Sequence, residues 1–82
     1  PDVEEQLRHQ LVEFVHSLRQ LDLKKAPAIS ETIDWARSLL LLHADSLEQD
    51  LVADTLNVLL KFEEDIEAAS PELRKLLQAV KA

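Results

Sequence analysis

Apolar residues recur at helical spacing in the first quarter of the chain, and this pattern constrains the fold more than any other feature. Asp2 followed by Glu5 forms a capping-box pattern, so a helix is expected over residues 2–21. Its apolar residues follow 4-3-4-3 spacing, which places them on one side of a helix. They are Leu7, Leu11, Phe14, Leu18 and Leu21.

A second helix is expected to begin near Ser30, a favourable N-cap, with Glu31 in its first turn. The connector before it, residues 23–29, holds a proline that disfavours helix in the preceding residue. Leu41 and Leu42 fall on another side of this helix, so either it lies centrally or its extra face meets something outside the chain. The expected inner stripe is Ile33, Ala36 and Leu40, with Ile29 and Leu39 beside it.

A third helix is expected after Ser46 as N-cap, with Gln49 at the capping-box position, and to run unbroken to Ala69. Ser70 and Pro71 then restart the chain as cap and first helical residue. The apolar stripe of this third helix is Leu51, Thr55, Val58, Leu59, Phe62 and Ile66. A short fourth helix follows, and its apolar residues are Leu73, Leu76, Leu77 and Val80.

These elements predict an all-α fold: a small antiparallel helical bundle of three main helices plus a short C-terminal helix, in one domain over residues 1–82. The chain has no glycine, which excludes a phosphate-binding glycine loop, a dinucleotide fingerprint and a nucleophile elbow. It has no cysteine, which excludes disulfides and thiolate sites. No catalytic residues are therefore assigned.

The net charge is −7, from 16 acidic and 9 basic residues. This balance argues against binding to nucleic acid or to an anionic membrane, because both need a basic surface. No apolar run approaches the length of a membrane span, and the N-terminus does not resemble a secretory signal. The cytoplasm is the expected compartment. The missing initiator methionine suggests a processed or excised piece.

Two groups of residues could be mistaken for metal or acid–base sites. His9, Glu13 and His16 share one side of the first helix, but that side is expected to be solvated, so no metal is assigned. His43 is expected to cap a turn or to be partly packed. The acidic run Glu63, Glu64, Asp65 and Glu67 is expected to be a solvated helix face, with an acidic docking patch as the alternative.

Trp35 is the least expected residue, at the margin of the second helix's inner stripe. It is interpreted as an aromatic at the core edge or, alternatively, as part of a surface that packs against another domain, where tryptophan is enriched.

Two segments resemble a known family. Residues 24–37 read KKAPAISETIDWAR, and residues 50–66 read DLVADTLNVLLKFEEDI. They are similar to the C-terminal lid of MoxR-family AAA+ ATPases, in which a basic-Pro-x-x-x-Glu-Thr-x-Asp-Trp-Ala pattern opens a lid helix. The second segment resembles the final lid helix. The likeness covers residues 12–66.

The resemblance implies a parent protein with an upstream αβα nucleotide-binding domain, which is absent from this chain. ATP and Mg would bind to the parent, whereas the fragment would bind no cofactor. The parent would work in a ring, usually a hexamer, as an ATP-driven chaperone or metal-cofactor maturation factor. Its partners would be the AAA+ core, neighbouring subunits and a von Willebrand A-domain protein. The Glu-Thr-x-Asp-Trp pattern resembles the branch associated with carbon monoxide dehydrogenase maturation.

One departure from the family concerns the sensor-2 arginine, which lids commonly place at the start of the helix that opens here near Ser30; this chain has no arginine there. Lys24 and Lys25 are the nearest cations and become candidate nucleotide-sensing residues, with two solvated loop lysines as the alternative. The rival hypothesis is a stand-alone interaction or dimerisation module that uses Trp35, Leu41 and Leu42 as its interface. A third hypothesis is a metal carrier that uses the histidine face of the first helix.

Overall fold

Helices make up most of the computed structural model, which describes residues 3–81 and the side chains of residues 5–80. No strand occurs among these residues, so the predicted all-α bundle is confirmed. The described helices are α1 (Val3–Leu18), α2 (Ile29–Leu41), α3 (Gln49–Leu59), α4 (Glu63–Ala69), the short 3₁₀ helix η1 (Ser70–Glu72) and α5 (Leu73–Lys81).

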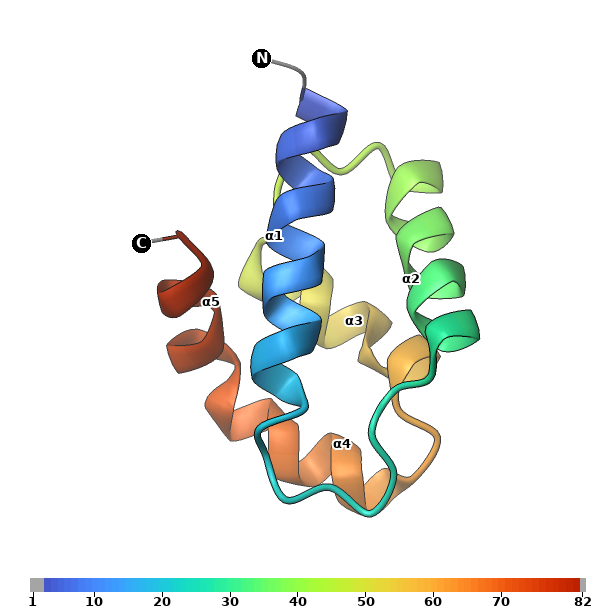
Figure 1. Cartoon of the computed structure of the whole chain (residues 1–82), viewed down its shortest axis with the longest axis vertical. Coiled ribbons are helices and arrows are strands. Elements are labelled where there is room, and N and C mark those ends of the chain that lie inside the picture. The colour runs from blue at the N-terminus through green and yellow to red at the C-terminus, as the bar shows by residue number, and fades with distance from the viewer. Residues whose placement is uncertain (1–2, 82) are drawn as a thin grey trace.

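The helices pack around α1, as Figure 1 shows. α2 and α5 lie on either side of α1 and run in the opposite direction, while α4 lies across its lower end in this view. α3 packs against both α2 and α5 and completes the bundle. None of the helices within residues 3–81 is long and apolar enough to cross a membrane.

The first helix agrees with its sequence pattern, because its apolar stripe faces the core. Leu7, Leu11, Phe14 and Leu18 are buried, and Leu21 is half-buried beyond the helix end. The backbone tightens after Leu18, where Leu21 N–H donates to the Leu18 carbonyl instead of continuing the α-helical pattern. The capping role predicted for Asp2 lies outside the described residues.

The inner stripe predicted for α2 is wrong at three of its positions, although Ala36 is half-buried against the core and Leu39 is buried, as expected. The helix buries Trp35 and Leu39, together with Glu31, whereas Ile29, Ile33 and Leu40 are exposed. Apolar residues occupy two overlapping stripes on this helix, and α3 packs against the one that carries the large indole ring. The expected N-cap is also wrong, because Ala28 rather than Ser30 precedes the first helical turn.

The expected third helix is divided in two. α3 ends at Leu59, and Leu60 adopts an extended conformation with φ −114° and ψ 126°. Leu59 and Leu60 are both 1% exposed, and the extended backbone lets these adjacent side chains enter the core together. α4 therefore starts at Glu63 in a new direction across the bundle.

The caps predicted for the later helices also differ. α3 begins after Glu48, and the Ser46 hydroxyl donates to the Glu48 carboxylate at 3.2 Å instead of capping the helix. The Ser70 hydroxyl donates back to the Ile66 carbonyl at 2.7 Å, and Pro71 lies in η1. The predicted inner side of α5 is confirmed: Leu73 and Leu77 are buried, and Leu76 and Val80 are half-buried.

Candidate functional site

The connector between α1 and α2 is held by a carboxylate that lies 40 residues further along the chain. Asp65 Oδ1 accepts the backbone N–H of Lys24 at 2.7 Å, and Oδ2 accepts that of Lys25 at 3.0 Å. Asp65 is buried, so the expectation that residues 63–67 form a uniformly solvated face is wrong at this position. Glu63, Glu64 and Glu67 are exposed, as expected.

A second buried carboxylate, Glu31, holds the end of the same connector. Its Oε1 accepts the backbone N–H of Ala28 at 2.8 Å, which satisfies a free donor at the start of α2. Its buried Oε2 lies 3.3 Å from Lys61 Nζ and 3.7 Å from Lys25 Nζ but makes no aligned hydrogen bond among the described residues. The Ala28 N–H lowers the pKa of Glu31; burial opposes this, and Lys61 and Lys25 add to the lowering.

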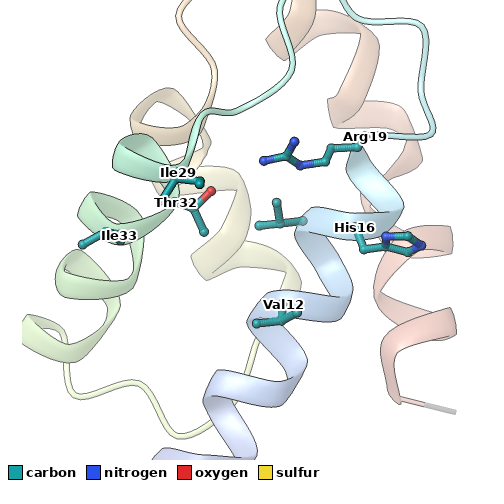
Figure 2. A pocket seen from close by; sticks show the side chains of 7 residues that line it. Val12, His16, Arg19, Ile29, Thr32 and Ile33 are labelled. Atoms are coloured by element: carbon teal, nitrogen blue, oxygen red, sulfur yellow. The ribbon is translucent and has the colours of Figure 1, made fainter.

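Arg19 provides the third tie on the connector. One guanidinium nitrogen, Nη2, donates to the carbonyl of Pro27 at 2.7 Å. Figure 2 shows this side chain reaching from the end of α1 towards the start of α2. The connector is therefore held by Arg19 at its own start and by side chains from α2 and α4, although it has no regular secondary structure.

The two candidate nucleotide-sensing lysines lie on this connector, and both ammonium groups face carboxylates. Lys24 Nζ lies 3.3 Å from Glu64 Oε1 and 4.7 Å from the centre of the Phe62 ring. Lys25 Nζ lies near Glu31. Both lysine side chains are about half-exposed, at 55% and 47%. The Lys24–Glu64 pair is exposed on both sides and holds Lys24 only weakly, whereas the Glu31 carboxylate that faces Lys25 is only 10% exposed. Their nucleotide-sensing role stays a prediction.

Trp35 belongs to the core and not to an outer surface. Its side chain has 0% exposure, and its ring centroid lies 5.5 Å from that of Phe14. Its indole N–H donates to Thr55 Oγ1 at 2.8 Å. The interface role expected for Trp35 is therefore wrong for the surface of this chain, because packing between α1, α2 and α3 already covers the indole.

Leu41 and Leu42 end α2 with their side chains outside the core. Their exposed fractions are 80% and 57%, and Leu40 beside them is half-exposed. The helix stops there because His43 takes a positive φ of 57° and the Ala44 N–H turns back to the Leu39 carbonyl. The interface role of the two leucines stays a prediction.

An open groove runs between α1 and α2, with a volume of about 290 Å³ (Figure 2). We call it the α1–α2 groove. It was not predicted, because the residues along its α2 side were expected to face the core. Its lining residues are Val12, Val15 and His16 from α1, Arg19 directly after α1, and Ile29, Thr32 and Ile33 from α2.

The histidine face of α1 is where the sequence placed it. His9, Glu13 and His16 are all exposed. Within the described part of the chain, no three His, Cys, Asp or Glu side chains are arranged to hold a metal ion.

Sequence reasoning placed Thr55 on an inner stripe but missed its hydrogen bond with Trp35, and it missed the burial of Glu31 and Asp65 altogether. Thr55 lies within an apolar stripe, so its polar side chain could have signalled a partner such as the indole N–H of Trp35. Asp65 gives no such signal, because its neighbours Glu63, Glu64 and Glu67 are acidic as well.

Comparisons with protein-family models, with curated proteins and with solved structures found no match.

Proposed function

We propose that this chain is the lid subdomain of a MoxR-type AAA+ ATPase and has no activity in isolation. One observation carries the proposal: the two segments that resemble the family, residues 24–37 and 50–66, pack directly on each other. Asp65 binds the backbone of Lys24 and Lys25, and Thr55 accepts the indole N–H of Trp35. A shared pattern in two separated segments is expected when those segments support each other's geometry.

The hydrogen bonds that hold the connector are expected in a subdomain that moves as a rigid body. In the proposed parent, the lid closes over ATP and passes its movement to the ring. Movement is transmitted only if the connector and α2 keep a constant geometry. Asp65, Glu31 and Arg19 provide this constraint through hydrogen bonds to the connector backbone.

Lys24 and Lys25 are proposed as the cations that approach the bound nucleotide, each acting as a point charge on a phosphate oxygen. A phosphate would have to compete with Glu64 for Lys24 and with Glu31 for Lys25. The exposed Lys24–Glu64 pair is worth at most about 1 kcal/mol, so a phosphate contact can replace it. At Lys25 the buried Glu31 carboxylate keeps Lys61 at 3.3 Å as a second cation when Lys25 turns to a phosphate.

The proposed parent is a cytoplasmic, ATP-driven chaperone or metal-cofactor maturation factor. The upstream AAA+ core and the neighbouring subunits are its structural partners, and a von Willebrand A-domain protein is a further one. Leu41 and Leu42 are proposed to face one of the structural partners, since both are exposed beside each other.

The test uses the full-length parent with Lys24→Ala and Lys25→Ala combined. ATP turnover should fall, while the matched variant Lys75→Ala, which changes an exposed lysine on α5, should turn over normally. Unchanged turnover in the double variant would refute the sensing role. The isolated chain should bind ATP barely or not at all.

The coding sequence upstream tests the lid assignment itself. A Walker A motif in the same reading frame, about 150 to 200 residues before Pro1, supports the lid, since this is the size of a typical domain. A start codon directly before Pro1 would instead support the second candidate, a stand-alone interaction or dimerisation module. The exposed side chains of Leu41 and Leu42 favour that candidate as well.

A further inference from the structure

On α2 a charged side chain is buried while large aliphatic side chains are exposed, which is the reverse of what core packing alone would favour. Glu31 is buried, whereas Ile29 is 76% and Ile33 47% exposed. The burial of Glu31 is explained by its partners, the Ala28 N–H and the Lys61 ammonium group, but large aliphatic residues on one continuous strip are rarely left in water without a function. This face of α2 therefore has a use beyond the packing of this chain.

The exposed strip is long enough to receive a helix. Ile29, Ile33 and Leu40 follow one another at intervals of four and seven residues, which places them on one side of α2. At 1.5 Å per residue the strip extends for about 16 Å, or three helical turns. Val12 of α1 is 56% exposed and, with Ile29 and Ile33, lines the α1–α2 groove, as Figure 2 shows.

The ionisable side chains that line the groove are basic, although the chain as a whole is acidic. Its ionisable lining residues are His16 and Arg19, and no carboxylate lines it. Arg8 lies one turn before Val12 on α1, and Arg37 lies one turn after Ile33 on α2; both are exposed. The acidic residues near the groove are Glu5, which pairs with Arg8 at 3.8 Å, and Glu13 and Asp34, which are exposed and do not line it.

Arg19 is the cation of this group whose side chain is hydrogen-bonded to the backbone of the connector. Its bond to the Pro27 carbonyl fixes the guanidinium across the groove and uses one of its nitrogens. The remaining N–H donors have no partner among the described residues. A guanidinium with unpaired N–H donors can bind a carboxylate, because two of its parallel N–H groups match the spacing of the two carboxylate oxygens.

We propose that the α1–α2 groove binds an amphipathic helix of a partner protein, one that carries aspartate or glutamate beside an apolar stripe. The stripe would pack between Val12 and Ile33, and the carboxylates would pair with Arg19 and Arg37. This is helix-in-groove recognition, with the helix anchored at intervals of three and four residues. The proposal rests on the groove and not on the lid assignment.

A second copy of the chain fits this surface poorly. Two-fold pairing brings the same patch of each copy together. Arg8, Arg19 and Arg37 of one copy would then face the same cations of the other, and like charges across an interface are costly.

The test titrates the isotope-labelled chain with two synthetic helical peptides and follows its backbone amide resonances. Both peptides carry leucine at intervals of three and four residues; one has glutamate beside the leucines and the other has lysine. The glutamate peptide should shift the amides around Val12 and Ile33 and bind at least about tenfold more tightly, with an affinity that falls as salt rises. Equal affinities, or no shifts at the groove, would overturn the proposal.

Three variants complete the design. Ile33→Asp should abolish binding of the glutamate peptide, whereas Leu41→Asp, on another side of α2, should leave it unchanged. Arg37→Glu should weaken the glutamate peptide and strengthen the lysine peptide. Because all three positions are exposed, the folded spectrum should be kept.

Sedimentation of the unliganded chain tests whether a second copy of the chain, instead of a partner helix, occupies the α1–α2 groove. A dimer that Ile33→Asp dissociates would assign the groove to a second copy and refute the proposal. ATP turnover in the parent and peptide binding by this chain are separate readouts, so failure of one proposal does not decide the other.

Discussion

The indole N–H of Trp35 donates to Thr55 Oγ1 at 2.8 Å, and the Thr55 hydroxyl donates onward to the Leu51 carbonyl at 2.8 Å. This chain of hydrogen bonds joins α2 to α3 inside the core, since Trp35 is fully buried and Thr55 nearly so. It satisfies the one polar atom of the largest core side chain, so Trp35 can fill the space between three helices without an unpaired donor.

Thr55→Val should lower the free energy of unfolding by about 1 to 3 kcal/mol, because it leaves the indole N–H buried without an acceptor. Trp35→Phe should cost a similar amount through lost volume and the lost hydrogen bond. Urea denaturation followed by circular dichroism measures both. The double variant should cost less than the sum of the two, and strict additivity would contradict the coupling.

Asp65→Asn should destabilise the chain by about 2 to 3 kcal/mol, because an amide can accept only one of the two backbone N–H groups and turns its own donors towards the other. Glu67→Gln, at an exposed position of the same helix, is the control and should change stability by less than about 0.5 kcal/mol. Hydrogen exchange at the Lys24 and Lys25 amides should become faster in the Asp65 variant alone. If the Lys24 and Lys25 amides exchange as slowly as in the control, the hydrogen bonds from these amides to Asp65 do not hold the connector.

Glu31 should make the chain sensitive to acid. Its pKa is lowered in the folded state, mainly by the Ala28 N–H, so its contribution to stability is present above the pKa of an unfolded glutamate, about 4.3. The contribution is lost as the pH falls through the lower folded-state pKa. Urea midpoints measured from neutral to acidic pH should therefore fall less steeply in Glu31→Gln than in the unmodified chain. Parallel pH profiles would contradict this assignment.

His43→Gly should raise the free energy of unfolding, by up to about 1 kcal/mol. The residue has a φ of 57°, in the left-handed region where a Cβ is unfavourable, and glycine relieves this at some cost in chain entropy. His43→Ala keeps the Cβ and is the matched control, with little expected change. Thermal unfolding of the two variants gives the comparison; equal melting temperatures would mean that the backbone here is unstrained.

The burial of α1 could be read from the sequence, whereas that of α2 could not. The apolar residues of α1 that point inward form a single stripe, so helical periodicity alone identifies its inner side. On α2 the apolar residues form two overlapping stripes, one through Ile33 and Leu40 and one through Trp35 and Leu39. Helical periodicity alone does not show which of the two stripes faces the core. The choice between them follows from where α3 packs and from the acceptor that Thr55 offers to the indole.

The break between α3 and α4 is also decided by packing between helices and not by local sequence. Residues 60–62 contain no proline or glycine, so local preference favours a continuous helix. Burial of both Leu59 and Leu60 stops the helix, and the new direction of α4 brings Asp65 to the connector.

Local spacing was enough to establish a small all-α bundle and the inner side of α1, because residues three and four apart in a helix share a face wherever the helix is placed. The inner side of α2, the end of α3 and the one buried carboxylate of the acidic run were decided by contacts between residues 20 to 41 positions apart. Such contacts exist only after the helices have packed, because the burial of a side chain depends on its neighbours in space and not on its neighbours along the chain.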